Sequence, residues 1–359
     1  MSLDLIQEAR RQIEICNACR YCEGFCSVFP AMTRQNSFAD GDISQLANLC
    51  HNCRGCYYSC QYTEPHEFAL NLPAALAEVR VESWERLIRP RRLAALFQTH
   101  GVAMAAVAVI ALAAFFWALV AFKPTRGDGF YAHLAHGTLV AIFLPAFVAP
   151  LALIALALRD YWREVGGGRL RLRHLGVALR DAARLKNLSG GQGQGCNFEQ
   201  GDRYSDRRRV YHQLMMYGFV LCFASTSSGT VMHYALGWQA PYPIWSLPKL
   251  LGIPGGVMMV VGGAGLGWLK TKADPALGAA RVWGGEMAFL LLLVAVALTG
   301  LVLYAATGTA AVAPLLAIHL ATVLTLFLLM PFSKMVHGFF RLAALVVEAG
   351  KPAPKGGGA

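Results

Sequence analysis

The sequence predicts an all-α protein with a soluble N-terminal domain and six membrane-spanning helices. First, 56% of the 359 residues are hydrophobic and only 15% are charged, whereas soluble domains average about 25% charged residues. Second, the apolar residues are concentrated in runs of about 20 residues, which is the length that an α-helix needs to cross a bilayer. The composition therefore argues against a fully soluble enzyme, a disordered protein and a small disulfide-rich secreted domain.

Residues 1–92 are expected to form the soluble domain. They begin with the polar stretch MSLDLIQEARRQIEIC, which lacks the apolar segment of a signal peptide, so we expect the N-terminus to stay in the cytoplasm. Residues 1–100 contain 10 Lys and Arg against 11 Asp and Glu, so the net charge of +11 belongs to the rest of the chain. Basic residues beside membrane spans explain that charge, and no nucleic-acid partner is predicted.

Residues 93–359 are expected to form the membrane domain. An amphipathic stretch from Trp84 to His100 leads into it and is expected to lie along the membrane interface. The expected spans are about 101–122, 133–158, 213–236, 252–269, 284–306 and 311–333. The fourth contains Gly263 and Gly267, a small-xxx-small pair that is typical of close helix packing.

The distribution of Lys and Arg predicts the orientation of the spans. The loop 159–211 contains 12 of them, whereas the segments expected outside contain only Lys123, Arg126 and Lys249, which gives 29 inside against 3 outside. The positive-inside rule then places both termini in the cytoplasm of a multi-pass protein of the bacterial inner (cytoplasmic) membrane. Within the loop, GGQGQGCNFEQGD (190–202) is either a docking segment or a linker, and the tail KPAPKGGGA is expected to be disordered.

Eight of the ten cysteines form one motif that occurs twice. The spacing is C-x2-C-x2-C-x3-C, and the second copy follows the first by 34 residues. In two-cluster ferredoxins the first three cysteines of such a motif ligate one cluster and the fourth ligates the other. The spacing therefore predicts a two-cluster, ferredoxin-like domain. One [4Fe–4S] cluster is assigned to Cys16, Cys19, Cys22 and Cys60, and the other to Cys50, Cys53, Cys56 and Cys26.

Structural zinc is the alternative for these cysteines. Zinc sites pair two C-x2–4-C knuckles, without a third cysteine at the same step, so the spacing favours the clusters. Disulfides are rare in a reducing cytoplasm. The 23 residues between Cys26 and Cys50 exceed a compact ferredoxin hairpin, and SFADGDISQLANL within them predicts a helix. We therefore expect an α-helical ferredoxin-like domain.

Histidines within the spans are functional candidates, because a polar ring in hydrocarbon needs a partner. Antiparallel spans bring His212 level with His337 near the cytoplasmic face, and His233 roughly level with His319 near the outer face. Such pairs suit bis-histidine haem b, which predicts a cytochrome b-like six-helix bundle. The first pair is the predicted haem site, with interfacial histidines as the alternative, and the second pair is a candidate for a second haem.

The other histidines and cysteines have weaker signals. His133 and His136 compete as outer haem ligands, whereas His100 and His174 are expected to be interfacial or solvated. His51 belongs to the soluble domain, as does His66. The two remaining cysteines lack a partner motif, and lone buried cysteines are usually inert; they are Cys196 and Cys222.

The segment from His319 to His337 (HLATVLTLFLLMPFSKMVH) resembles the last haem-bearing helix of the respiratory nitrate reductase gamma-subunit superfamily. This resemblance implies that both histidines, on one helix, are haem ligands, with His212 as the opposing ligand on the cytoplasmic side. The chain departs from the superfamily at Cys222, which stands where the opposing helix carries its second histidine. Only the site between His212 and His337 therefore has both ligands.

The order of the whole chain resembles the tricarballylate utilisation protein B family, also called citrate utilisation protein B. The shared features are the doubled cysteine motif, the membrane anchor and a basic loop with GxGCNF. The resemblance implies a partner on the cytoplasmic side, an FAD-dependent dehydrogenase that converts tricarballylate to cis-aconitate. This chain would reoxidise the reduced FAD and pass the electrons to membrane quinone.

The chain shows no Rossmann fingerprint, P-loop or nucleophile triad, so we expect substrate oxidation on the partner. Two other functions use parts of the same pattern. A quinol-oxidising subunit that feeds a cytoplasmic reductase, as in heterodisulfide-reductase-like systems, would run the same cofactors in reverse. A membrane redox sensor would contain clusters without haem.

Overall fold

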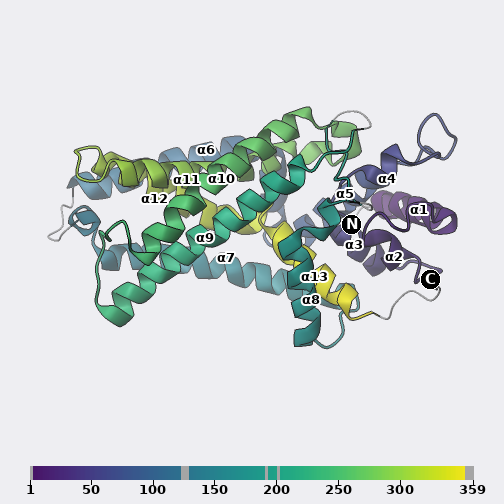
Figure 1. The fold of residues 1–359 in the computed structure, drawn as a ribbon, viewed down its shortest axis with the longest axis horizontal. Helices are drawn as coiled ribbons and strands as arrows, with labels where there is room; N and C mark the ends of the chain where they lie inside the picture. Colours follow the sequence, from purple (N-terminus) through teal and green to yellow (C-terminus); the bar gives the residue numbers. More distant parts are fainter. Residues whose placement is uncertain (1–2, 123–128, 191–192, 200–202, 352–359) are drawn as a thin grey trace.

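A computed structural model describes residues 3–122, 129–190, 193–199 and 203–351. Within these residues the regular structure is helical, apart from one isolated β-bridge between Cys196 and Ser205. The molecule is elongated, with the N-terminal helices at one end and the long apolar helices at the other (Figure 1). The predicted all-α fold class is confirmed.

The N-terminal domain is built from five helices: α1 (Leu3–Cys19), α2 (Val28–Met32), α3 (Asp40–Leu49), α4 (Gly55–Tyr58) and α5 (Leu72–Leu87). The helix expected between the two cysteine motifs is present as α3. Helices α1 and α3 pack on α5 through the buried side chains of Ile13, Ile43 and Leu76. Asn71 caps α5 by accepting a hydrogen bond from the Ala74 N–H, which satisfies a free donor of the first turn.

Six helices of the described residues are long and apolar enough to cross a membrane. They are α6 (Arg91–Phe122), α7 (His136–Glu164), α9 (Arg207–Leu236), α10 (Leu247–Lys272), α11 (Trp283–Ala305) and α12 (Val312–Leu329). Large apolar side chains on their outer faces are exposed, including Val107 at 68% and Phe122 at 83%. Exposed apolar surface of this extent marks contact with lipid, so the chain is a membrane protein.

The amphipathic stretch before the first span is divided between two helices. Trp84 belongs to α5, and α6 begins at Arg91, directly after Pro90, because proline cannot continue a helix from the preceding turn. Helix α6 then bends at His100, whose φ of −111° and ψ of 20° are not helical. The bend lies one residue before the expected start of the first span.

The sixth span does not continue to His337. Helix α12 ends at Leu329, a 3₁₀ turn (η5, Met330–Phe332) follows, and α13 (Val336–Ala349) begins afterwards. The expectation of a single helix carrying His319 and His337 is therefore wrong. Pro331 lies in the 3₁₀ turn, and a proline removes a helical hydrogen bond and clashes with the preceding turn.

Glycines allow α10 to approach its neighbours closely. A Cβ atom on Gly262 would lie 2.6 Å from the backbone nitrogen of Met215 on α9, and one on Gly263 would lie 2.3 Å from the Val294 side chain on α11. Gly267 also faces α11. These close approaches agree with the helix packing that the small-xxx-small pair predicts.

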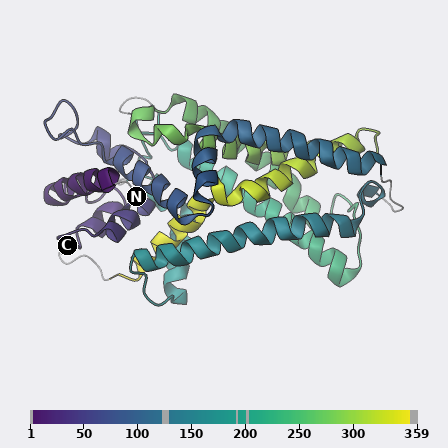
Figure 2. The same cartoon turned by 180° about the vertical axis from the view of Figure 1, so that it is seen from behind.

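Helices α8 (Leu172–Arg184) and α13 join the two parts of the molecule. Helix α13 packs on α3, α7 and α8, and Figure 2 shows α6 and α7 on either side of α12. Gln45 of α3 donates a hydrogen bond to the Ala344 carbonyl at 2.9 Å and accepts one from the Tyr161 hydroxyl at 2.8 Å. Buried polar contacts of this kind fix the N-terminal domain on the ends of the spanning helices.

Parts of two predictions lie outside the described residues. Two of the three basic residues expected outside, Lys123 and Arg126, are among them, as is the tail from residue 352 onward.

Candidate functional site

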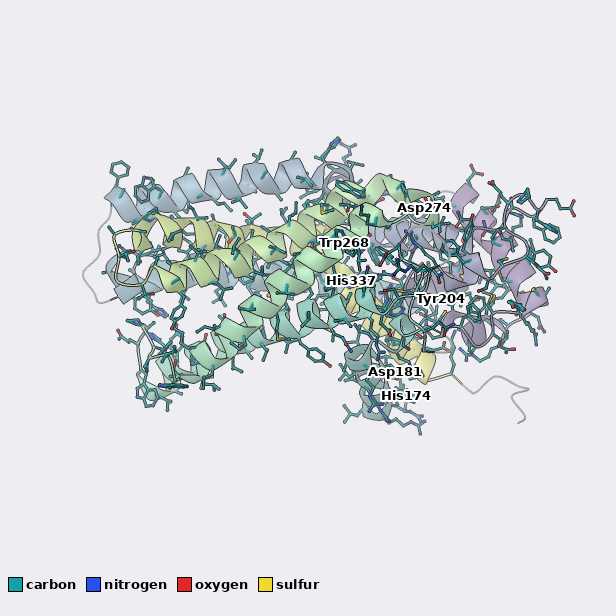
Figure 3. All side chains as sticks on the ribbon, turned by 45° about the horizontal axis from the view of Figure 1, so that its top comes forward. His174, Asp181, Tyr204, Trp268, Asp274 and His337 are labelled. Atoms are coloured by element: carbon teal, nitrogen blue, oxygen red, sulfur yellow. The ribbon has the colours of Figure 1, made fainter. Side chains whose placement is uncertain are left out.

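The eight motif cysteines lie in two groups, and each group takes its fourth cysteine from the other motif. The first group is Cys16, Cys19, Cys22 and Cys60, which line a cavity of about 190 Å³ together with Cys56, a residue that also lines the second hollow. The second group is Cys26, Cys50, Cys53 and Cys56, which line a hollow of about 20 Å³. Figure 3 shows sulfur atoms gathered in the N-terminal domain.

The two motifs share one backbone feature but differ in their first halves. The residue after the second cysteine of each motif, Arg20 or Arg54, has a positive φ, of 58° or 66°, and a non-glycine residue in this left-handed region is strained. Cys16 and Cys19 lie in the last turns of α1, whereas Cys50 and Cys53 lie in non-helical backbone between α3 and α4. Backbone N–H groups also donate to sulfur, from Asn52 to Cys50 at 3.4 Å and from Tyr62 to Cys60 at 3.3 Å. Hydrogen bonds to cysteine sulfur are among the features that tune iron–sulfur clusters.

The surroundings of the cysteines disfavour free thiolates. Burial, and then the neighbouring Cys60, raise the pKa of Cys16 and that of Cys22 to about 12. Burial also raises the pKa of Cys53 to about 11 and the pKa of Cys26 well above its ordinary value. Thiolates at these positions therefore need a compensating positive charge, as bound iron would provide.

The two groups differ in how well they fit a cluster. The first cavity is open and roomy, whereas the second hollow holds little more than one water molecule, so a cluster there requires its cysteine side chains to rotate outward. Within the described part of the chain, no three His, Cys, Asp or Glu side chains are arranged to hold a metal ion. The donor set of four sulfur atoms in each group fits an iron–sulfur cluster in its chemistry.

Two histidines meet where the spanning helices reach the N-terminal domain. His212 on α9 and His337 on α13 have ring centroids 6.0 Å apart, at an interplanar angle of 81°. Metal–imidazole bonds of about 2.0 Å would place two rings on opposite sides of one metal at about this centroid separation. The pair therefore supplies two neighbouring imidazoles, as a bis-histidine site requires, and Figure 3 shows His337 at the junction of the two parts.

Hydrogen bonding leaves these rings suited to bind a metal. The Nδ1–H of His337 donates to the carbonyl of Lys334, which leaves Nε2 free to act as a ligand. Metal-binding histidines commonly donate their other ring N–H to a carbonyl in this way. Nδ1 of His212 is buried without a hydrogen-bond partner among the described residues, so this ring has no structural hydrogen bond there to explain its burial.

His51 lies between the second cysteine group and the histidine pair, a position that sequence reasoning missed. It lines the second hollow beside Cys50, and its Nδ1–H donates to the Leu49 carbonyl at 2.8 Å. Burial lowers the pKa of His51 well below its ordinary value, and the nearby charges of Arg341, Arg208 and His212 act in the same direction. The sequence indicates this position only in that His51 directly follows the motif cysteine Cys50.

The outer histidines are arranged differently from the expected pair. His233 stacks on His136, with ring centroids 4.2 Å apart, and Nε2 of His136 lies 2.9 Å from the Tyr234 hydroxyl. His319 instead shares a 3.0 Å hydrogen bond with the Thr299 hydroxyl on α11. The described contacts therefore associate His233 with the competing candidate His136, and they show no contact between His233 and His319.

The glycine-rich segment of the basic loop docks on the N-terminal domain. Cys196 is 1% exposed and pairs with Ser205 in the β-bridge. The neighbouring Asn197 N–H donates to the Cys53 carbonyl at 2.9 Å. These contacts lie within the chain and do not decide between a docking segment for a partner and a linker, and residues 191–192 and 200–202 lie outside the described residues. The Cys222 thiol donates to the Gly252 carbonyl on α10 at 3.9 Å.

The fold and the cysteine groups define a membrane protein with an N-terminal ferredoxin-like domain. A family model described as the citrate utilization protein B Fer4-like domain matches residues 9–85, and one described as citrate utilization protein B matches residues 87–357. The chain is 43% identical over 345 residues to citrate utilization protein B of Escherichia coli, covering 94% of this chain and 90% of that protein. The chain therefore belongs to the citrate utilization protein B family. No solved structure matches it.

Proposed function

We propose that this chain is the membrane electron-transfer subunit of an oxidoreductase that acts in tricarballylate or citrate utilisation. It reoxidises the reduced FAD of a partner dehydrogenase on the cytoplasmic side. Electrons pass through two [4Fe–4S] clusters and haem b to the quinone pool of the bacterial inner membrane. The family membership and the name of the Escherichia coli relative support the pathway.

The order of the three sites along the molecule carries this proposal. The first cysteine group lies nearest solvent, since Cys19 is exposed and Tyr21 at the rim of its cavity is 70% exposed. The second group has no exposed cysteine, and His51, which lines its hollow, is close enough to His212 for their charges to interact. This order leads from a surface that a flavoprotein can approach to the start of the spanning helices.

The chain's own residues hold and orient the groups. The interleaved motifs supply four sulfur ligands to each cluster, and the clusters supply one-electron transfer when bound. His212 and His337 would hold the haem iron, and the Lys334 carbonyl orients the His337 ring by accepting a hydrogen bond from its Nδ1–H. The exposed apolar surface of the spanning helices gives a lipid-soluble quinone access from the bilayer.

An optical spectrum of the reduced minus the oxidised protein tests the proposal. We expect a b-type haem band together with about eight iron atoms per chain in clusters, as two [4Fe–4S] centres require. We also expect the partner dehydrogenase to reduce a quinone analogue only when this chain is present. Clusters without any haem band would contradict the site at His212 and His337 and favour a redox sensor.

Cys60→Ser is expected to remove the cluster of the first group, although Cys60 belongs to the second motif. Iron content should fall from about eight to about four atoms per chain. A second change in the same group, Cys16→Ser, should remove no further iron from the Cys60→Ser variant. By contrast, adding Cys53→Ser should remove the remaining iron, as measured by iron analysis and electron paramagnetic resonance.

The control for this series is Cys222→Ser, which removes a cysteine outside both groups and should leave the iron content unchanged. If Cys60→Ser and Cys53→Ser affected one cluster, and Cys16→Ser affected the other, each motif would hold its own cluster and the interleaved assignment would be wrong.

A further inference from the structure

Four arginines from four parts of the chain converge on the loop of the second cysteine group. Arg80 of α5 and Arg341 of α13 each donate to the Cys50 carbonyl at 2.7 Å. Arg208 of α9 donates to the Asn52 carbonyl at 2.7 Å. Arg54, inside the motif, donates to the Asn52 side-chain oxygen at 3.1 Å. We call these four residues the cationic cage.

The cationic cage lacks carboxylate partners. Within the described residues no ion pair joins any of the four to an acidic side chain, whereas Arg10, Arg86 and Arg281 all have one. Arg54 and Arg80 are 4% and 8% exposed. Burial and the nearby Arg208 lower the pKa of Arg54 to about 10. Buried guanidinium groups without a counter-charge are costly, so this arrangement calls for an anion nearby.

The first cysteine group has no such cage. Its cavity is lined by cysteine, aromatic, apolar and uncharged polar side chains, with no charged residue among them. Two of the four arginines come from helices of the membrane domain, Arg208 from α9 and Arg341 from α13, and Figure 3 shows nitrogen atoms near His337 at the junction of the two parts. By the same hydrogen-bond criterion, the described residues give the first motif one arginine, Arg20, which donates to the Asn17 carbonyl at 3.1 Å. The positive charge is therefore concentrated at the second cysteine group, with four arginines against one.

We propose that the cationic cage raises the reduction potential of the cluster at the second group above that of the cluster at the first group. This inference rests on the proposed function. A [4Fe–4S] core of charge 2+ with four thiolates has a net charge of 2−, and reduction makes it 3−. Burial alone opposes that added charge, whereas four nearby guanidinium groups favour it.

The cage thereby gives electron transfer a direction. With clusters bound, one electron would pass from the first group to the second, which would oxidise the first core from 1+ to 2+ and reduce the second from 2+ to 1+. No proton or other reactant is needed. Because Arg208 and Arg341 belong to the membrane domain, the potential difference depends on that domain being docked on the cysteine groups.

A redox titration of the full-length protein in detergent, followed by electron paramagnetic resonance, tests the inference. Arg80→Gln and Arg54→Gln should each shift the second cluster to lower potential and leave the first cluster unchanged. Arg80→Lys keeps the charge and should hold the potential near that of the unmodified protein. Cys19→Ser, which removes a ligand of the first cluster, identifies which signal belongs to which group.

The matched control is Arg10→Gln, which removes an arginine from an exposed ion pair with Asp40 and should shift neither potential. Potentials that stay unchanged in both Gln variants with full iron content, or that shift equally at both clusters, would overturn this inference alone. An unmodified protein without iron–sulfur signals would overturn the proposed function as well. The inference would also be wrong if Arg80→Gln lost the second cluster and Arg54→Gln left the reduction potential of that cluster unchanged.

Discussion

His337→Ala is expected to abolish the b-type haem band of the reduced protein while leaving about eight iron atoms per chain in its clusters. His337 and His212 face each other with ring centroids 6.0 Å apart, so removal of either ring leaves haem iron with one protein ligand. The methyl group of alanine cannot replace an imidazole nitrogen. The optical spectrum and a haem assay on the purified protein measure the result.

Two comparisons make this result specific. His100→Ala changes an exposed histidine at the bend of α6 and should leave the haem band intact. His319→Ala should also leave the band of the site at His337, because His319 contacts Thr299 on α11. Retention of the full band in His337→Ala would refute the assignment of the haem to this pair. Loss of half the band in His319→Ala would instead indicate a second haem.

Local spacing predicts how the cysteines divide between two clusters, and this assignment stays a prediction. Three cysteines at three-residue steps curl around one point, and the fourth is directed away from it. The structure places Cys60 in the first group and Cys26 in the second. This grouping follows from backbone geometry over a few residues, so no knowledge of distant contacts was needed, and cluster binding itself stays a prediction.

Depth in the membrane was sufficient to relate His212 to His337, but it did not reveal the break between α12 and α13. Pro331 is the residue in the sequence that indicates this break, although it lies within a continuous apolar run. Hydrophobic runs indicate where a span lies, whereas a proline determines where its hydrogen-bonding pattern stops.

The cationic cage could not be predicted from the sequence. Arg54, Arg80, Arg208 and Arg341 are separated by as many as 287 positions, and each was counted only as part of a charge distribution. Their convergence depends on the docking of α13 and of the Cys196 segment on the N-terminal domain. Tertiary contacts of this kind leave no periodic pattern in a single chain.

Glu286→Gln is expected to destabilise the protein by about 1.5–3 kcal/mol, the usual contribution of hydrogen bonds between charged groups, because the ion pairs of Glu286 are only partly buried, with Lys334 35% exposed. Glu286 on α11 accepts hydrogen bonds from Lys334 at 2.6 Å and from Lys270 on α10. The side chains are 20% exposed at Glu286 and 15% at Lys270. Glutamine removes the negative charge and leaves two ammonium groups close together. Thermal unfolding in detergent measures the loss.

The same change should weaken haem binding, because Lys334 connects the ion pair to the haem site. Its side chain binds Glu286 and its carbonyl accepts the hydrogen bond from His337.

Adding Lys270→Met to Glu286→Gln removes one of the two unpaired charges and should restore part of the stability, which a purely steric effect of glutamine would not do. Glu8→Gln breaks an exposed pair with Arg11 and should cost less than about 1 kcal/mol. Equal losses of unfolding free energy from Glu286→Gln and Glu8→Gln would show that the ion pairs of Glu286 with Lys270 and Lys334 contribute no more than a surface pair. Helix packing alone would then determine the geometry of the haem site.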